Sequence, residues 1–249
     1  MKIEIEDLSC RIGKKLLLSH VSMSFEGRRI VGVIGPNGCG KTTLLRHIYR
    51  DIPVRGHVFL DGKDVSDYGR RIFAQKVAVM AQRLSQADEG LTVGDLVRMG
   101  RYPYKGILEQ YDEEDERIVR EALEQTGLSE FKNRRLGTMS GGEAQRAMIA
   151  KCFVQQPGAI ILDEPTNHLD VKYKLELMRL LKGFGGLVIL TVHDLNLAAD
   201  YCDYLYVMKD GEVRGEGEPE AVLTEALLGE VFEVPFRAVR SGGRVILSV

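Results

Sequence analysis

The chain has 249 residues, of which 44% are hydrophobic, so one or two domains with a sizeable core fit its length. Its 34 Lys and Arg residues are matched by 36 Asp and Glu residues, which argues against a dedicated nucleic-acid-binding protein, since such a protein carries a basic excess. The first residues lack the apolar core of a secretory signal, and no segment approaches the roughly 20 apolar residues that span a bilayer. If the protein acts at a membrane, we expect another chain to cross it.

Strands are predicted first along the chain from the alternation of apolar and polar residues. Residues 3–5 and 21–25 alternate in this way and predict two half-buried strands. Residues 29–34 form an apolar run that ends at a glycine-rich loop, so we expect an interior strand there. A further strand is predicted at 57–60, before an Asp-Gly turn.

The middle of the chain changes to a helical pattern. One helix is predicted from near Asp112 to Gly127, with an acidic first turn. Its acidic run is interpreted as a solvated helix start rather than a metal site. The apolar face of this helix would consist of Ile118, Val119, Ala122 and Leu123.

Strands return in the last third of the chain, at residues 159–162 and 187–192. Hairpins are predicted around the Asp210-Gly211 turn and at 241–243. Strands that alternate with helices, interrupted by a helical block, indicate an α/β fold with a helical subdomain. The predicted division is a core of residues 1–83 and 158–249 and a helical subdomain of residues 84–157.

Residues 35–42, GPNGCGKT, match the phosphate-loop motif G-x-x-x-x-G-K-S/T between a strand and a helical stretch. Glycines let the backbone wrap around phosphate oxygens, and the helix N-terminus adds positive potential. We expect Lys41 to reach the β- and γ-phosphates and the Thr42 hydroxyl to bind Mg²⁺. A chance match is disfavoured by this context, although the motif alone does not separate an ATPase from a GTPase or a kinase. The nucleotide-binding residues predicted here are Gly35, Pro36, Asn37, Gly38, Cys39, Gly40, Lys41, Thr42 and Thr43.

Two further polar groups follow in an order that suits nucleotide chemistry. Asp163 and Glu164 end an apolar strand, where two acids would ordinarily begin a solvated loop. With a phosphate loop upstream, Asp163 is interpreted as a carboxylate for Mg²⁺ and Glu164 as the group that polarises an attacking water. Ser140, Gly141 and Gly142 open a helix just before that strand and predict a second anion site.

The ordered set of motifs closely resembles the ABC ATPase family. The signature loop of that family is L-S-G-G-Q/E, and this chain has MSGGE, with Met139 in place of leucine. Gln82 resembles the Q-loop glutamine, residues 167–170 (NHLD) the D-loop, and His193 the switch histidine. A lone glutamine would usually be a surface residue and a lone histidine a core residue, but their spacing favours the family roles. Because NHLD lacks the lysine of the guanine-reading N-K-x-D motif, ATP is the favoured nucleotide.

The resemblance covers nearly the whole chain and implies a single ABC ATPase domain, 1–249. Its fold would be a P-loop NTPase core with a mostly parallel sheet, N-terminal antiparallel strands and an inserted helical subdomain. It also implies a homodimer in which ATP and Mg²⁺ lie between the phosphate loop of one subunit and the signature loop of the other. The implied catalytic residues are Lys41, Gln82, Glu164 and His193, the metal-binding residues are Thr42, Gln82 and Asp163, and Ser140, Gly141 and Gly142 would contact the γ-phosphate on the partner.

Two residues near the predicted nucleotide carry hypotheses of their own. The family usually stacks an aromatic residue on adenine, but the alignment places Ile12 there, so we expect weaker discrimination between ATP and GTP. Cys39 lies in the phosphate loop beside Lys41, where its thiol is either a reactive thiolate or an inert small side chain. The other cysteines, Cys10, Cys152 and Cys202, form no C-x-x-C pair, so reduced thiols in a cytosolic protein are expected.

The direction of transport is predicted from two strings. Residues 100–103 (GRYP) and 193–199 (HDLNLAA) resemble the ATPases of bacterial importers for ferric siderophores, haem and cobalamin. This resemblance implies a peripheral subunit on the cytoplasmic face of the membrane, where residues 83–104 contact integral membrane permease subunits. A substrate-binding protein would be an indirect partner. A soluble ABC ATPase and an exporter ATPase are the alternatives, and the cargo itself is not encoded in this sequence.

Overall fold

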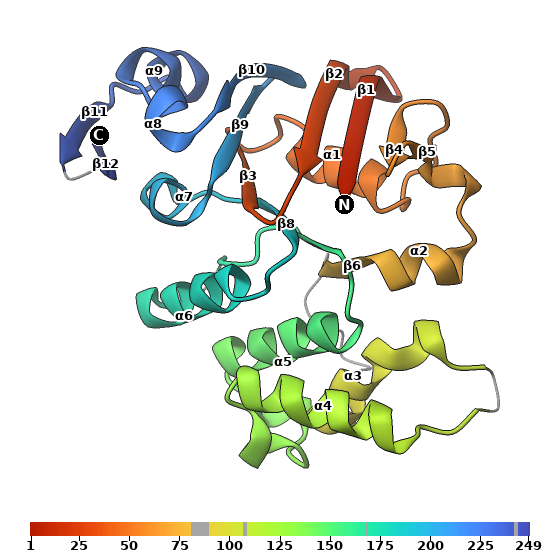
Figure 1. Ribbon diagram of the computed structural model, residues 1–249. Coiled ribbons are helices and arrows are strands. Elements are labelled where there is room, and N and C mark those ends of the chain that lie inside the picture. Colours follow the sequence, from red (N-terminus) through yellow and green to blue (C-terminus); the bar gives the residue numbers. More distant parts are fainter. Residues whose placement is uncertain (81–89, 107–108, 168, 242–243) are drawn as a thin grey trace. The chain divides into compact units, whose positions relative to one another are not determined.

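The computed structural model describes residues 1–80, 90–106, 109–167, 169–241 and 244–249. The chain forms two compact units (Figure 1), here called unit 1 and unit 2. Unit 1 comprises Met1–Tyr68, Ile161–Glu164 and Gly185–Val249, and unit 2 comprises Gly69–Ile160 and Pro165–Phe184. The predicted subdomain 84–157 falls within unit 2, which contains further residues on both sides of it. Among the described residues, every helix is too short or too polar to cross a bilayer.

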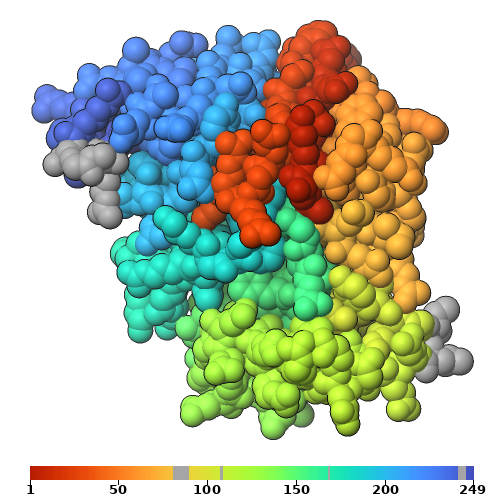
Figure 2. All heavy atoms as spheres, in the orientation of Figure 1, coloured from red at the N-terminus to blue at the C-terminus, as the bar shows by residue number. Residues whose placement is uncertain are grey.

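Unit 1 begins with an antiparallel sheet in the order β2-β1-β4-β5. Its strands are β1 (Lys2–Ile12), β2 (Lys15–Glu26), β4 (Val58–Leu60) and β5 (Lys63–Asp64). The predicted alternation is confirmed, because Ile3, Ile5, Val21, Met23 and Phe25 are all buried. The β1–β2 hairpin, red in Figure 2, reaches the surface.

The second sheet of unit 1 has the neighbours β10-β9-β3-β8-β7. Its strands are β3 (Ile30–Ile34), β7 (Ala159–Leu162), β8 (Leu187–Thr191), β9 (Tyr204–Lys209) and β10 (Glu212–Gly217). Strand β3 pairs in parallel with both β8 and β9, whereas β10 pairs antiparallel with β9 around the predicted Asp210-Gly211 turn. Because parallel strands end at the same edge of a sheet, the segments after β3 and β8 meet there.

Short helices and a final hairpin complete unit 1. They are α1 (Lys41–Ile48), the 3₁₀ turn Val65–Asp67, α7 (Leu195–Tyr201), α8 (Pro219–Val222), α9 (Glu225–Phe232), β11 (Arg237–Ser241) and β12 (Arg244–Ser248). The predicted C-terminal hairpin is thus confirmed. The side chain of Asn196 in α7 contacts this hairpin: it accepts a hydrogen bond from the Leu247 amide at 2.8 Å and donates one to the Leu247 carbonyl at 3.1 Å.

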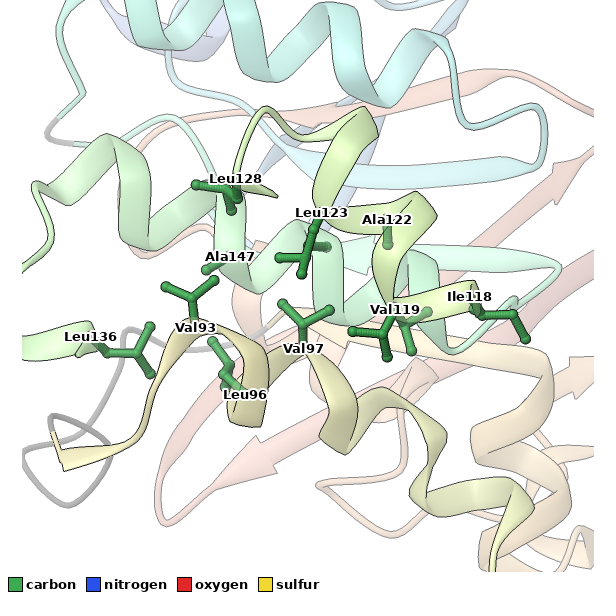
Figure 3. Close-up of a cluster of buried hydrophobic side chains, with 12 residues drawn as sticks. Val93, Leu96, Val97, Ile118, Val119, Ala122, Leu123, Leu128, Leu136 and Ala147 are labelled. Carbon is green, nitrogen blue, oxygen red and sulfur yellow. The ribbon is translucent and has the colours of Figure 1, made fainter. Parts of the chain in front are cut away.

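Unit 2 is mainly helical, and β7 passes from it into unit 1. Its elements are α2 (Arg70–Lys76), β6 (Val77–Met80) beside β7, α3 (Val93–Arg98), the 3₁₀ segment η3 (Met99–Tyr104), α4 (Glu113–Gln125), the 3₁₀ turns Ser129–Phe131 and Leu136–Thr138, α5 (Gly141–Val154) and α6 (Val171–Lys182). Figure 3 shows apolar side chains of α3, α4 and α5 packed into one cluster. Helix α4 begins after Asp112, as predicted, with an acidic first turn. Its predicted apolar face belongs to this cluster and consists of Ile118, Val119, Ala122 and Leu123.

The prediction that the acidic first turn of α4 is solvated is wrong for one of its residues, Asp115. Asp115 is buried, with its carboxylate 2.8 Å from Arg101 Nε and 2.5 Å from Lys105 Nζ. Asp115 also accepts a hydrogen bond from the Asp112 amide and closes the capping box of α4. The interpretation failed because the two cations come from η3 and the residue after it, which periodicity within one helix does not reveal.

The predicted α/β fold with antiparallel N-terminal strands is confirmed.

Candidate active site

The loop after β3 is shaped by glycines that no other residue could replace without rearrangement. Gly35 has φ 151°, and a Cβ there would collide with the Met208 carbonyl oxygen. Gly40, the N-cap of α1, has φ 108°, and its Cβ would lie 2.6 Å from the Leu17 carbonyl oxygen. The backbone of β2 and β9 therefore leaves no room for a side chain at these two positions, whether or not a phosphate is bound.

The turn between β9 and β10 supports the same loop. The Gly211 amide donates a hydrogen bond to the Cys39 carbonyl at 3.0 Å, and the Ser19 amide donates to the Gly211 carbonyl at 2.9 Å. A Cβ on Gly211 would lie 2.7 Å from the Leu17 carbonyl oxygen. The loop is thus packed against β2 and against the turn between β9 and β10, and the turn is far from the loop in sequence.

Lys41 projects from the first turn of α1 back into the loop. Its ammonium donates to the carbonyl oxygens of Gly35 at 2.7 Å and Pro36 at 2.9 Å, and the residue is only 5% exposed. Thr42, the next residue, is exposed. A buried ammonium surrounded by loop carbonyls, beside an exposed threonine, can bind the phosphates of a nucleotide.

Two acidic residues, Asp163 and Glu164, follow β7, and Thr191 at the end of β8 hydrogen-bonds to the carboxylate of the first and the backbone amide of the second. The fully buried Thr191 hydroxyl donates to Asp163 Oδ1 at 2.8 Å and accepts from the Glu164 amide at 2.6 Å. Glu164 has φ 50°, an uncommon left-handed conformation for a residue with a side chain. Such strain often marks functional positions because the surrounding contacts must maintain it.

His193 completes the cluster in unit 1. Its Nε2 lies 2.5 Å from Glu164 Oε1, and the two side chains are 31% and 37% exposed. An ionised carboxylate only accepts, so an ionised Glu164 pairs with the imidazole tautomer that carries its proton on Nε2. A hydrogen-bonded carboxylate and imidazole of this kind can take part in proton transfer.

Ser140 starts helix α5 in unit 2. Its hydroxyl accepts from the Glu143 amide at 3.3 Å, and the Glu143 carboxylate accepts from the Ser140 amide at 2.8 Å. This reciprocal capping box leaves Ser140 and Gly141 exposed at the N-terminus of α5, while Gly142 is buried. A helix N-terminus whose first residues are exposed can bind an anion.

Comparison with known proteins identifies the family to which this chain belongs. Residues 18–167 match the family model described as ABC transporter. The chain belongs to the ABC transporter family. It is 40% identical over 243 residues to the ABC transporter ATP-binding protein YvrA of Bacillus subtilis, covering 95% of this chain but 55% of YvrA.

Other relatives match this ABC ATPase over most of both chains. The petrobactin import ATP-binding protein FpuD of Bacillus anthracis is 37% identical, covering 93% of this chain and 86% of FpuD. The ferric enterobactin transport ATP-binding protein FepC of Escherichia coli is 33% identical, covering 91% and 85%. The solved structure of a metal-chelate type ABC transporter, with a TM-score of 0.82 at 22% identity and coverage of 98% and 95%, confirms the fold.

The predicted site residues fall into three groups in this ABC ATPase. Unit 1 brings together the loop residues, Asp163, Glu164 and His193, whereas Ser140, Gly141 and Gly142 lie in unit 2. Gln82 and His168 of the NHLD string lie outside the described residues. Thr191 was missed, although a threonine that ends the apolar run LVILT was a signal available in the sequence.

Two hypotheses about single residues have different outcomes. Ile12 is 57% exposed near the end of β1, so its side chain is free to contact a base, and its effect on base selectivity stays a prediction. The thiolate hypothesis for Cys39 is wrong. Burial raises the pKa of the Cys39 thiol and outweighs the opposing effect of Lys41, which favours the alternative of an inert small side chain. Sequence proximity to a cation did not reveal that the side chain is 3% exposed.

Proposed function

We propose that this ABC ATPase hydrolyses ATP with the unit 1 cluster and thereby powers an importer of iron chelates. The observation that carries the catalytic part is the hydrogen-bonded chain from Asp163 through Thr191 to Glu164 and His193. The loop amides and Lys41 bind the β- and γ-phosphates. When the nucleotide binds, the Lys41 ammonium gives up its hydrogen bonds to the Gly35 and Pro36 carbonyl oxygens and donates to phosphate oxygens instead. The nucleotide therefore replaces contacts that already orient the ammonium.

In this proposal Glu164 accepts the proton of the attacking water. Its backbone is fixed by the hydrogen bond of its amide to Thr191, which limits the reorganisation that accompanies proton transfer. His193 Nε2–H then donates to the γ-phosphate oxygens instead of to Glu164. The exposure of both side chains leaves room for water and phosphate.

The oxygen donors at the site fit a magnesium ion. Thr42 is exposed in the first turn of α1, and Thr191 engages one oxygen of the Asp163 carboxylate while a second oxygen remains available as a ligand. Hard oxygen ligands are those that Mg²⁺ prefers. When bound, the ion neutralises charge on the phosphates. We propose Thr42 and Asp163 as its protein ligands, with Gln82 as a further one by resemblance.

The signature loop acts on a second copy of the chain in this proposal. The helix N-terminus at Ser140 and Gly141 is exposed, as a surface that binds an anion on another molecule must be. ATP closes the homodimer because it contacts the phosphate loop of one subunit and the signature loop of the other. The closed state therefore binds ATP more tightly than the open state, and hydrolysis to ADP and phosphate breaks the link that the γ-phosphate makes between the two loops, so that the dimer reopens.

The names of the relatives support an iron-chelate cargo. They include import ATP-binding proteins for petrobactin, iron(3+)-hydroxamate and hemin, at 35–37% identity. We infer that this chain binds an integral membrane permease at the cytoplasmic face of the membrane. The permease in turn receives a ferric siderophore or haem from a substrate-binding protein. A soluble ABC ATPase and an exporter subunit are the competing assignments.

Glu164→Gln tests the catalytic assignment. The variant should bind ATP like the wild type, while hydrolysis falls about 10²–10⁴-fold, since the general base is lost. Glu220→Gln is the control, because Glu220 is an exposed carboxylate elsewhere in unit 1. Hydrolysis at the wild-type rate by Glu164→Gln would disprove the role of Glu164.

The transport assignment needs a separate experiment. Purification from detergent extracts should recover a membrane permease with the tagged chain. Loss of the gene should then reduce uptake of one radiolabelled ferric siderophore or haem. Recovery with ribosomes or DNA would favour the soluble class instead. Ile12→Tyr should raise affinity for ATP more than for GTP, and equal gains for the two nucleotides would contradict its assignment to the base.

A further inference from the structure

Tyr173 in the first turn of α6 lies against Gly142 in the first turn of α5, both within unit 2. At this contact the ring of Tyr173 covers the backbone of Gly142, the second glycine of the signature loop. A Cβ on Gly142 would be 2.7 Å from both Cγ and Cδ1 of the tyrosine ring. These atoms lie at the base of the ring, so the whole side chain would have to move to make room.

The neighbouring glycine provides an internal contrast. A Cβ on Gly141 would meet no heavy atom within 4 Å. Neither glycine has a positive φ, so backbone strain requires glycine at neither position. The absence of a side chain at position 142 is therefore explained by Tyr173, and this explanation does not extend to position 141.

Additional contacts tie the same two segments together. Arg146 of α5 lies 5.9 Å from the centre of the Tyr173 ring, and its Nη1 lies 3.2 Å from the Glu176 carboxylate of α6. The Gln145 side chain donates to the Pro165 carbonyl, which precedes the D-loop. Pro165, Tyr173 and Glu176, which lie just before and just after the D-loop, thus all contact helix α5, and Tyr173 lies against the Gly142 backbone of the signature loop.

We propose that Tyr173 is the positioning residue of the signature loop. Its ring sets the place of the Gly142 backbone, and hence the direction of the amides at the α5 N-terminus. Because Tyr173 lies three residues after Asp170, it links the position of the D-loop segment to that of the signature loop. This inference rests on the proposed function, in which those amides contact the γ-phosphate on a second copy.

Thermal unfolding tests the packing part without any nucleotide. Gly142→Ala should lower Tm by about 5 °C, since an added methyl forces the ring out of its place. Gly141→Ala, the matched control, should leave Tm unchanged or raise it slightly. In a Tyr173→Ala background, Gly142→Ala should cause no further loss, and a loss as large as in the wild-type background would overturn the contact.

Steady-state hydrolysis tests the positioning part. Tyr173→Ala should lower kcat about 10-fold while the Kd of a fluorescent ATP analogue for the isolated chain stays within about twofold, because Tyr173 acts through the signature loop and not the phosphate loop. Tyr173→Phe keeps the ring and should restore kcat. Val171→Ala, at a largely exposed residue on the same turn, is the control and should behave like the wild type.

The outcomes separate this inference from the proposed function. If the wild-type chain neither binds nor hydrolyses ATP, the proposed function fails, and the thermal cycle still decides the packing. If the wild type hydrolyses ATP and Tyr173→Ala retains its kcat, the positioning role alone is refuted. Failure of Tyr173→Phe to restore kcat would also refute it, because the contact is made by ring carbons.

Discussion

Replacement of Asp115 by asparagine should destabilise unit 2 strongly. Asp115 is 2% exposed, and its two carboxylate oxygens contact Arg101 at 2.8 Å and Lys105 at 2.5 Å. Arg101 is itself buried and also donates to the Val154 carbonyl and the Gln156 side chain, both at 3.1 Å. Asparagine keeps the shape of the side chain but removes the only negative charge that Arg101 contacts among the described ion pairs.

The cost follows from leaving a buried cation without its counterion. Breaking a buried ion pair in this way costs about 3–5 kcal/mol. Asparagine retains one acceptor for the Asp112 amide, which places the expected loss near the lower end, about 3 kcal/mol. For a chain of this size that corresponds to a fall in Tm of about 6–12 °C. Thermal melts followed by circular dichroism, with urea melts beside them, measure it.

A matched control comes from the outer face of the same helix. Arg117 of α4 pairs with Glu114 and Glu121, and all three side chains are about half exposed. Arg117→Ala should shift Tm by less than about 2 °C, since exposed ion pairs contribute little. Equal shifts for Asp115→Asn and Arg117→Ala would refute the reasoning, because burial would then not decide the strength of these contacts.

Three other outcomes are expected. Thr191→Val should lower kcat about 10-fold and Thr191→Ser should retain it, because only a hydroxyl joins Asp163 to the Glu164 amide; equal rates for the two variants would contradict this. Cys39 should react with iodoacetamide more slowly than free cysteine at pH 8, as followed by mass spectrometry, because burial raises the pKa of its thiol; faster labelling would contradict it. Asp112 has its pKa lowered to about 2, chiefly by a hydrogen bond from Lys105, so its stabilisation is complete above the unfolded pKa near 4 and is lost as the pH falls towards 2; Tm measured from pH 5 to 2 should fall less steeply for Asp112→Asn.

Local patterns predicted most of the fold. The alternation at residues 21–25 and the apolar run at 187–192 each became a strand, because the burial of one or both faces leaves a periodic signal in the sequence. The helix from Asp112 was predicted because its capping residue and its apolar face act within one segment. By contrast, the burial of Asp115 depends on Arg101 and Lys105, whose positions follow from tertiary packing.

The candidate site was predictable where a motif carries the chemistry. The loop around Lys41, together with Asp163, Glu164 and His193, was placed in order from strings that end predicted strands. Thr191 was missed because its hydrogen bonds are made across neighbouring strands, which a motif search does not examine. The state of Cys39 was misjudged for a related reason: the sequence places it beside Lys41, but only the packing shows that it is buried.

The support of the phosphate loop by Gly211 has a consequence for synthesis on the ribosome. The loop at residues 35–40 is made early, yet the turn whose Gly211 amide donates a hydrogen bond to the Cys39 carbonyl is encoded more than two thirds of the way along the chain. A nascent polypeptide that has emerged only through unit 2 consequently carries the nucleotide motif without its scaffold. Competence to retain ATP should arise late in translation, after β9 and β10 have left the exit tunnel.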